Sequence, residues 1–503
     1  MGTIFLGKDT DGVTQELLLN RANRHGLVAG ATGTGKTVTL QILSEGFAKA
    51  GVPVFAADVK GDLSGISQSG SEHHKLHDKL VARAEKIGLA DYAYSAMPVT
   101  FWDLNGKKGH PIRATISEMG PMLLSRLMGL TDAQEGVMNI AFDVAETNEW
   151  PLIDLKDLKS TLIFLSENNK ELSLEYGRIA SVSVSAIIRD LLVLEREGAD
   201  EFFGEPALKL SDFIRHDEEG RGMINILAAD DLIHTPRLYS TFLLWLMSEL
   251  FEELPEVGDP DKPVMAFFFD EAHLLFDEAP KALVEKITQV SRLIRSKGVS
   301  IWFVTQNPAD IPDDVLGQIG NRVQHALRGY TPKEQKAIRA SSGAFRPNPK
   351  FKTQDVISEL GVGEALVSVL DAKGRPQVVG QTLIRPPASR LGPATASERK
   401  AILAESPMGG VYDEMVDRKS AYEILTVKRE AAKKAAEKAA AKDAKAKAKK
   451  KTAAKKPRRK RQSALEAGMK AGARSIASSV GRAIAGKHGA AIARGILGGF
   501  MRR

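Results

Sequence analysis

The eight residues GATGTGKT, numbered 30–37, constrain the fold of this chain more than any other feature. They follow the short apolar run GLVA and precede TVTLQILSEGFAKAG, which has the apolar spacing of a helix. A glycine-rich turn between a buried strand and a helix leaves backbone N–H groups free to surround phosphate oxygens, and it points the positive end of the helix dipole at them. The sequence therefore predicts a P-loop within an α/β core whose sheet is mostly parallel.

The residue types of this loop predict the contacts to a nucleotide. The glycines supply an unhindered backbone, Lys36 brings a positive charge to the β and γ phosphates, and Thr37 offers a hydroxyl to Mg²⁺. We therefore expect ATP and Mg²⁺ as the bound groups. The expected nucleotide-binding residues are Gly30, Ala31, Thr32, Gly33, Thr34, Gly35, Lys36, Thr37 and Val38.

An acidic pair ends a second apolar run, VMAFFFDEAH, at residues 264–273. The run predicts a Walker B strand, and Asp270 at its carboxyl end can hold the water shell of the metal. Glu271 can then orient or deprotonate the attacking water, so it is the expected catalytic base. The alternative is an ordinary strand that ends in two solvated acids.

A third buried strand, VSIWFVT, leads into the polar residues of QNP. In ATPases with an extra strand between the P-loop and Walker B strands, the polar residue at this position senses the γ-phosphate. Gln306 is the candidate sensor and Asn307 the second choice. The alternative is a turn formed by Gln-Asn-Pro.

Three arginines are candidates for a finger that stabilises charge on a neighbour's nucleotide. Arg292 and Arg295 lie three apart in VEKITQVSRLIRSKGV and share a helix face. Arg322 lies in the following strand. The alternative for each is an ordinary surface salt bridge.

The element DVKGDLSG, residues 58–65, follows the predicted strand VPVFAAD. The carboxyl ends of parallel strands share one edge of a sheet, so this loop is expected to face the nucleotide or the pore of a ring. A plain surface turn is the alternative. Further strands are expected at residues 99–104, 223–227, 323–327, 365–370 and 377–382.

Helical periodicity without strands marks residues 112 to about 215, which predicts an all-helical insertion in the α/β core. A stretch rich in Pro, Gly, Ser and Ala around residues 389–406 marks a boundary. The predicted organisation is a core in two parts, residues 1–111 and 216–390, with the insertion at 112–215, a linker at 391–427 and a basic, low-complexity Ala/Lys tail at 428–503.

Positive charge is concentrated in the tail. Residues 428–503 contain 24 Lys and Arg against 4 Asp and Glu, a net charge of +20, whereas the rest of the chain has a net charge of −13. A basic arm on an acidic body predicts an anionic partner, either non-specifically bound DNA or an anionic membrane surface. The alternative is a solvated tail that folds back on the acidic body.

Composition excludes several classes of protein. The chain has no cysteine, which excludes disulfides, thiolate metal sites and thiol catalysis. No run reaches the roughly 20 apolar residues of a membrane-spanning helix. The first residues lack the basic and apolar regions of a secretory signal, so we expect a cytoplasmic protein.

The motifs together resemble a known family. GATGTGKT, DVKGD, FFFDEAH, and SRLIRSKGV leading into TQNP resemble the HerA/FtsK branch of additional-strand P-loop ATPases over roughly residues 20–390. They are most similar to the HerA-like bacterial ATPases grouped as a domain of unknown function that lacks the N-terminal barrel. HerA itself carries that barrel before its P-loop and docks a nuclease with it. Here the P-loop begins at Gly30, so we do not expect a nuclease-coupled role.

The resemblance implies a RecA-like fold, hexameric rings and ATP-driven pumping of double-stranded DNA or, less often, of protein. It also implies that Lys36 and Thr37 contact the nucleotide and Mg²⁺, that Asp270 and Glu271 form the Walker B pair, and that Gln306 is the sensor. The expected function is therefore that of an ATP hydrolase acting on DNA as a ring-forming helicase or translocase. The alternatives are an ATPase that remodels protein or serves assembly or secretion at a membrane, and a scaffold that hydrolyses ATP slowly.

Overall fold

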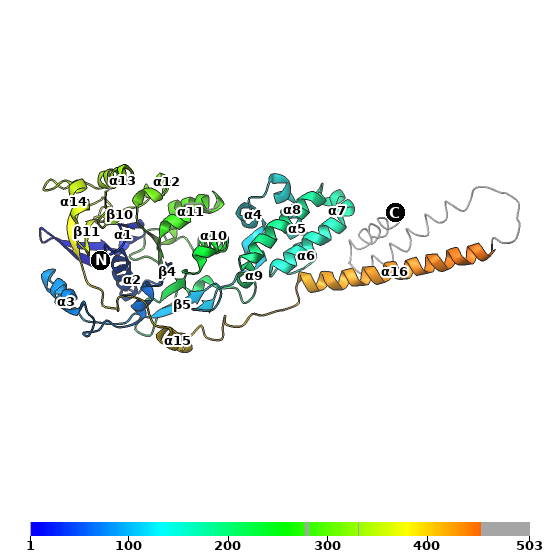
Figure 1. Cartoon of the computed structure of the whole chain (residues 1–503), viewed down its shortest axis with the longest axis horizontal. Coiled ribbons are helices and arrows are strands. Elements are labelled where there is room, and N and C mark those ends of the chain that lie inside the picture. The colour runs from blue at the N-terminus through cyan, green and yellow to red at the C-terminus, as the bar shows by residue number, and fades with distance from the viewer. Residues whose placement is uncertain (1, 277–280, 330, 454–503) are drawn as a thin grey trace. The chain divides into compact units, whose positions relative to one another are not determined.

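The structure, a computed structural model, describes residues 2–276, 281–329 and 331–453. The chain divides into two compact units. The first, the sheet unit, comprises residues 1–114 and 206–415, and the second, the helical unit, comprises residues 115–205 and 416–503. Figure 1 labels the helices and strands of both units.

One mixed sheet forms the frame of the sheet unit. Within the described residues it has 12 strands in the spatial order β2-β1-β12-β11-β10-β3-β9-β8-β4-β7-β5-β6. The strands are β1 (Thr3–Asp9), β2 (Thr14–Leu18), β3 (Gly26–Ala29), β4 (Val54–Asp58), β5 (Val99–Asp103), β6 (His110–Pro111), β7 (Ile224–Ala228), β8 (Met265–Phe269), β9 (Val299–Thr305), β10 (Asn321–Gln324), β11 (Glu364–Ser368) and β12 (Gly380–Ile384). The predicted α/β class with a mostly parallel, RecA-like sheet is confirmed.

The strands from β10 to β6 in this order run parallel. Strand β9 lies between β3 and β8, with Ala29 opposite Thr305 and Phe269 opposite Phe303. The extra strand expected between the P-loop and Walker B strands is therefore β9. The carboxyl ends of β3, β9, β8 and β4 meet at one edge, which we call the loop edge.

Four strands at the other side of the sheet are antiparallel, and two of them were not predicted from the sequence. Strands β1 and β2 form an N-terminal hairpin, and β1 also pairs with β12. Asp9 caps the hairpin turn by accepting the N–H groups of Asp11 and Val13, and Gly12 has a φ of +80°. The Asp-Gly pair between the two strand segments is the sequence signal for this hairpin.

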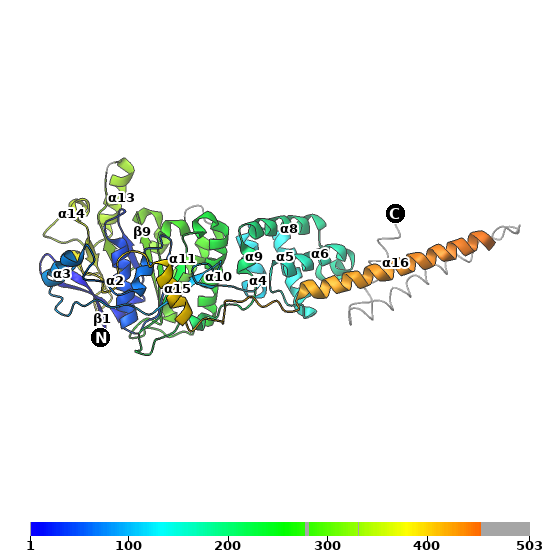
Figure 2. The same ribbon diagram turned by 60° about the horizontal axis from the view of Figure 1, so that its bottom comes forward.

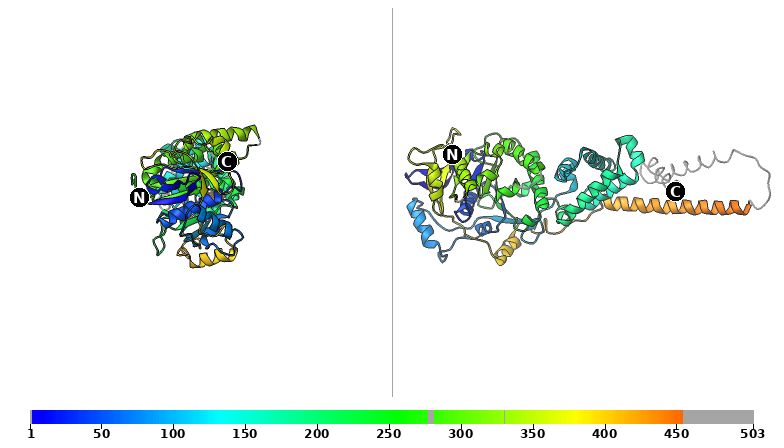
Figure 3. Two further views of the ribbon diagram at one scale, coloured as in Figure 1. Left: turned by 90° about the vertical axis from the view of Figure 1, so that its left-hand side faces the viewer. Right: turned by 45° about the horizontal axis from the view of Figure 1, so that its top comes forward.

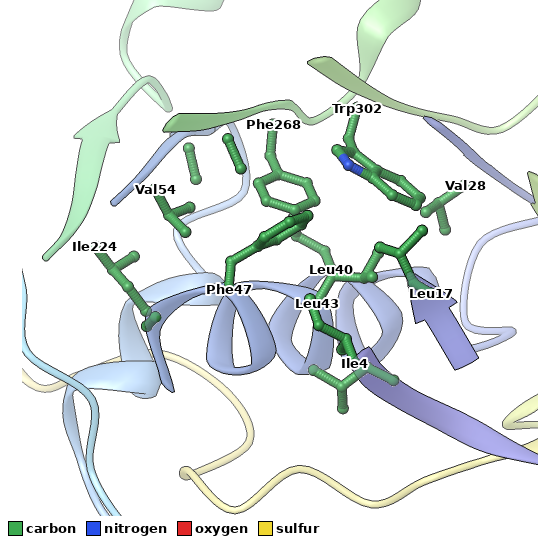
Figure 4. Close-up of a cluster of buried hydrophobic side chains, with 14 of the residues drawn as sticks. Ile4, Leu17, Val28, Leu40, Leu43, Phe47, Val54, Ile224, Phe268 and Trp302 are labelled. Carbon is green, nitrogen blue, oxygen red and sulfur yellow. The ribbon is translucent and has the colours of Figure 1, made fainter. Parts of the chain in front are cut away.

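The central strands alternate their side chains between two helical layers. On one face, Phe47 of α2 (Lys36–Lys49) packs against Phe268 and Trp302, as Figure 4 shows. On the other face, the ring centroid of Phe55 lies 6.3 Å from that of Phe242 on α10 (Pro236–Glu253). A strand covered on both faces is apolar throughout, which explains the lack of polar alternation in VFAAD and MAFFF.

Shorter helices complete the described part of the sheet unit. They are α1 (Leu19–Ala22), α3 (His77–Lys86), α11 (Lys281–Leu293), α12 (Asp313–Leu316), α13 (Pro332–Gly343), α14 (Thr353–Glu359) and α15 (Ala396–Glu405), with 3₁₀ helices η1 (Leu63–Ser67), η2 (Leu210–Asp212), η3 (Leu232–His234), η4 (Ala272–Leu275), η5 (Ile294–Lys297) and η6 (Pro308–Asp310). Helix α15 lies within the predicted linker. Thr395 and Glu398 form the capping box that starts it.

The helical unit contains α4 (Ile116–Leu127), α5 (Asp132–Thr147), α6 (Leu155–Glu167), α7 (Asn169–Tyr176), α8 (Ser181–Arg196) and α9 (Ala199–Phe202). All of residues 115–205 are described, and no β-strand interrupts these helices. In the right-hand view of Figure 3 they form one bundle, coloured cyan to green, beside the start of the orange helix α16.

Helix α16 (Ala421–Ala453) has 33 residues and is drawn as one long helix in Figure 2. Its first turns are anchored to the helical unit. Asp157 of α6 accepts the N–H of Tyr422 (2.8 Å), Leu425 is buried, and the Lys428 ammonium lies 4.5 Å from the centre of the Trp150 ring. The side chains of residues 440–446 are exposed. The end of the predicted tail, residues 454–503, lies outside the described residues.

Among the described residues, no helix combines the length and the apolar composition needed to cross a bilayer.

Candidate nucleotide site

The glycine-rich loop between β3 and α2 has the backbone conformation of a phosphate cradle. Gly30 and Gly35 have φ values of +156° and +117°, which residues with a side chain rarely adopt. The Gly30 N–H donates to Thr305 O (3.2 Å), and the Ala31 N–H donates to Ala326 O (2.8 Å). The loop is therefore held at its start by the chain at the ends of β9 and β10.

Lys36 begins α2 and directs its side chain back into the loop. Its Nζ donates to Gly30 O (2.7 Å) and Ala31 O (3.1 Å), and the residue is buried. Burial and, second to it, the nearby Lys60 ammonium lower the pKa of Lys36 from its ordinary value. A polyphosphate entering the loop would offer this ammonium anionic oxygens in place of two carbonyls.

The other predicted loop residues differ in their exposure to solvent. Thr32 and Gly33 are exposed, and Gly33 has a φ of +78°. Thr34 is buried and donates its hydroxyl to Ala31 O (2.7 Å). Val38 packs its side chain against the hydrophobic core, so only its backbone can serve the nucleotide.

A buried histidine that the sequence did not single out supports the loop from below. His325 Nδ1 bonds to Glu364 O (2.9 Å), and Nε2 bonds to Thr39 Oγ1 of α2 (2.8 Å). A carbonyl can only accept, so Nδ1 carries the proton and Nε2 accepts from the hydroxyl. Burial lowers the pKa of His325 to about 4, which keeps the ring neutral. A Cβ on Gly30 would lie 2.5 Å from His325 Cβ, so no larger residue fits there.

Oxygen groups beside the loop fit a magnesium ion. Thr37 Oγ1 donates to Asp62 Oδ2 (3.2 Å), and within the described residues Asp62 Oδ1 is buried without a hydrogen-bond partner. Burial and then the Glu271 charge raise the pKa of Asp270, at the end of β8, to about 6. No group of three His, Asp or Glu in the described chain could hold a metal alone. Mg²⁺, which keeps several waters, would be held through Thr37, Asp270 and the phosphates, whose charge it would neutralise.

Glu271 is buried and adopts an unusual backbone conformation, with φ +47° and ψ +50°. Its carboxylate forms an ion pair with Lys60, accepts both bonds from Gln306 Nε2 (3.3 and 3.2 Å), and lies 3.2 Å from His273 Nδ1. Although burial raises it, the hydrogen bonds from Lys60 and then Gln306 hold the pKa of Glu271 below its ordinary value. Glu271 is therefore an ionised carboxylate, as a general base must be.

Gln306 bridges the loop and the acidic pair. Thr32 Oγ1 donates to Gln306 Oε1 (3.2 Å), while Gln306 Nε2 donates to Glu271. The side chain thus spans from the P-loop to the predicted base. Asn307, the second candidate, instead accepts the Ala309 N–H (3.1 Å) and caps η6.

The three arginines lie away from this constellation. Arg295 in η5 precedes the amino end of β9 and pairs with Asp259 (2.8 Å). The seven residues of β9 separate that end from the loop edge by about 20 Å. Arg292, in the last turn of α11, pairs with Asp314 (3.1 Å). Arg322 donates to Leu316 O (3.0 Å), and burial lowers its pKa.

Arg292 also lines a surface groove. The groove has a volume of about 710 Å³ and lies between α11 and α12. Its lining residues are Val284, Glu285, Thr288, Gln289, Arg292, Leu293, Pro312, Asp313 and Asp314.

Two side chains of the DVKGD element reach the site although the sequence analysis assigned them no role. Asp62 meets Thr37, and Lys60 meets Glu271. The expectation that the loop faces the nucleotide rather than forming a plain surface turn is consistent with these contacts. The signal was the position of both residues just after a strand that ends at the loop edge.

A comparison with protein families gives the family that the sequence motifs resemble. A family model described as helicase HerA-like C-terminal matches residues 4–503. A comparison with curated protein sequences gave no match.

Among solved structures, VirB4 of Thermoanaerobacter pseudethanolicus is similar at 16% identity, with 78% of this chain and 97% of that chain covered and a TM-score of 0.48. The plasmid coupling protein TrwB in complex with ADP and Mg²⁺ is similar at 15% identity, with 74% and 90% covered and a TM-score of 0.45. The family match spans nearly the whole chain, so this protein is a P-loop ATPase and belongs to the HerA-like helicase C-terminal family.

Proposed function

We propose that this protein is a ring-forming motor that uses ATP hydrolysis to move along DNA. The observation that carries the proposal is α16, whose exposed residues after the anchored turns are mainly Lys and Ala. Lysines neutralise phosphates without reading bases, and a translocating motor needs binding that does not depend on sequence. The described tail, residues 428–453, carries 11 Lys and Arg against 3 Asp and Glu.

The site residues have distinct roles in this proposal. Lys36 and the loop backbone bind the phosphates, and Thr37 and Asp270 hold Mg²⁺. Glu271 accepts the proton of the attacking water. Gln306 senses the γ-phosphate, because its contacts to Thr32 and Glu271 join the loop to the base.

The ring is supported by the position of the arginines. Arg295 and Arg292 precede the amino end of β9, about 20 Å from the loop edge of their own sheet. Either one can therefore reach a γ-phosphate only in a neighbouring subunit. Asp314 and Asp259 hold the guanidinium groups of Arg292 and Arg295 at partly exposed positions. Arg322 is the weakest candidate because its partly buried guanidinium donates to the carbonyl of Leu316 within the sheet unit.

The ATPase rate with duplex DNA, single-stranded DNA, anionic vesicles and an unfolded protein tests the proposal. We expect duplex DNA to raise the rate severalfold and the other additions to have little effect. Stimulation by vesicles or unfolded protein alone would instead identify a membrane-associated or protein-remodelling ATPase. If no addition raised the rate, the protein would instead be a nucleotide-dependent scaffold that hydrolyses ATP slowly.

Charge replacement on α16 tests the DNA contact itself. Lys438, Lys442 and Lys445 are exposed and lie beyond the anchored turns. Changing all three to Gln should flatten the log–log salt dependence of DNA binding by about 2.7, whereas the matched change to Arg should not. Equal salt slopes for the two triple variants would contradict a role of this helix in DNA binding.

A further inference from the structure

The turn after β4 carries Lys60 at the loop edge on an ordered backbone. Asp58 is buried and accepts the N–H groups of Gly61 (2.8 Å) and Leu63 (3.1 Å). Gly61 has a φ of +76°, and its carbonyl accepts the Ser64 hydroxyl (2.8 Å). These bonds close the turn on both sides of Lys60, so the backbone that carries this lysine is ordered by the chain itself.

The Lys60 ammonium contacts the group that must activate water. It forms the ion pair with Glu271, whose side chain is 4% exposed, while the Lys60 side chain is 38% exposed. Gln306 and His273 contact the same carboxylate. In this arrangement both carboxylate oxygens accept hydrogen bonds, and the ion pair with Lys60 opposes protonation of Glu271.

Lys60 and Lys36 belong to one cluster of charged side chains. Each ammonium interacts electrostatically with the other and with Asp62, Asp270 and Glu271. Lys36 is tied to the loop carbonyls and is nearly inaccessible, whereas Lys60 comes from another loop and keeps an exposed side. An incoming γ-phosphate, with two negative charges and three oxygens, is a stronger partner for an ammonium than one carboxylate.

We propose that Lys60 is a γ-phosphate ligand that leaves Glu271 when ATP binds and returns to it when phosphate departs. With Lys60 on the γ-phosphate, Glu271 loses the ion pair that opposes its protonation, while Gln306 and His273 still orient the carboxylate. The water oxygen then bonds to the γ-phosphorus as the bond to the β–γ bridging oxygen breaks. ADP takes the electron pair of that bond, and the water proton goes to Glu271. With ADP bound, no γ-phosphate competes for the ammonium, so Lys60 returns to Glu271 and again opposes its protonation.

This inference rests on ATP turnover at the P-loop and makes Lys60 a residue that distinguishes ATP from ADP. Loss of one hydrogen bond between charged groups costs about 1.5–3 kcal/mol, which is about 10- to 150-fold in affinity. Lys60→Met should therefore weaken binding of the β,γ-imido analogue of ATP by at least about 10-fold. Binding of ADP should change less than about twofold, because ADP lacks the γ-phosphate.

Equilibrium titration with fluorescent nucleotides measures both affinities, and steady-state kinetics measures kcat and KM. For Lys60→Met we expect a higher KM for ATP together with a lower kcat, and Lys60→Arg should recover most of both. Lys79→Met, at an exposed position of α3, is the matched control and should behave as the wild type. Lys60→Gln provides a second neutral variant should the methionine variant be unstable.

A role confined to holding Glu271 in place predicts different results. Lys60→Met would then lower kcat alone and leave the ratio of ATP to ADP affinity unchanged, which would overturn the proposal. Combining Lys60→Met with Glu271→Gln further separates a role on the γ-phosphate from a role in holding Glu271. If Lys60 moves to the γ-phosphate, Glu271→Gln should tighten ATP-analogue binding, and Lys60→Met should remove that gain. Lys36→Ala serves as the reference: normal hydrolysis by that variant would refute the P-loop site itself, whatever Lys60 does.

Discussion

Acidification should destabilise the sheet unit through His325, the neutral histidine beneath the P-loop. Burial lowers its pKa to about 4 from an ordinary value of 6.5. Between these two values the unfolded chain binds more protons than the folded chain, so stability is complete above pH 6.5 and is lost as the pH falls toward 4. At pH 5 the loss from this one group is about 2 kcal/mol.

His325→Asn isolates this contribution. The asparagine amide can still donate to Glu364 O, but it cannot accept a proton near neutral pH. The variant should be less stable than the wild type at pH 8, since Thr39 loses its partner. Between pH 8 and pH 5, however, it should lose about 2 kcal/mol less stability than the wild type does. His25, whose pKa is also lowered to about 4 by burial, contributes equally to both proteins and cancels.

Urea denaturation followed by tryptophan fluorescence measures the difference. Three of the four tryptophans, Trp102, Trp245 and Trp302, lie in the sheet unit, and a Trp150→Phe background removes the signal of the helical unit. The comparison requires the same denaturant slope at both pH values. If wild type and His325→Asn lose equal stability on acidification, the ring is not held neutral under the loop, and the reasoning fails.

Three further predictions concern turnover. Lys36→Ala should abolish ATP binding, which equilibrium titration would reveal, and near-normal hydrolysis would contradict the loop assignment. Glu271→Gln should keep ATP bound but lower kcat by about 10²-fold or more. Asp270→Asn should instead weaken the Mg²⁺-dependent binding of ATP. Identical ATP affinities for the two variants would show that Asp270 and Glu271 do not have separate roles. Arg295→Ala should be inactive alone, yet an equal mixture with Glu271→Gln should regain about a quarter of wild-type activity if the arginine acts in trans around a ring. A mixture no more active than its components would exclude that arrangement.

The sequence predicted the central sheet well because its strands are covered on both faces. Runs such as VFAAD and MAFFF have no polar alternation, and a glycine loop or an acidic pair marks where they end. The N-terminal hairpin was missed because the polar residues within TIFLGKD and TQELL weaken the strand pattern. Strands β10 to β12 were found but placed a few residues off, since their ends are set by pairing with distant chain rather than by local residues.

Residues of the site divide in the same way. Lys36, Thr37 and Glu271 belong to motifs whose chemistry is local, so their positions were evident from the sequence. Lys60 and His325 act through contacts with residues more than two hundred positions away, at Glu271 and Thr39. The sequence placed the loop of Lys60 at the loop edge but not its partner, because such pairs form only when the parallel strands bring their loops together.

The strand order dictates when this protein can fold during synthesis. In the described sheet, β3 pairs with β9 and β10 alone, and β4 with β7 and β8 alone. Each of these two strands therefore remains unpaired until residues much later in the chain are synthesised. At ribosomal rates of about 5–20 residues per second, β4 remains without a partner for roughly 10–30 s before β7 emerges. The helices of residues 115–205 form a contiguous segment and can fold in that interval. The nascent P-loop strand is thus an exposed apolar segment for much of translation, and chaperone capture of the unfinished chain is the expected consequence.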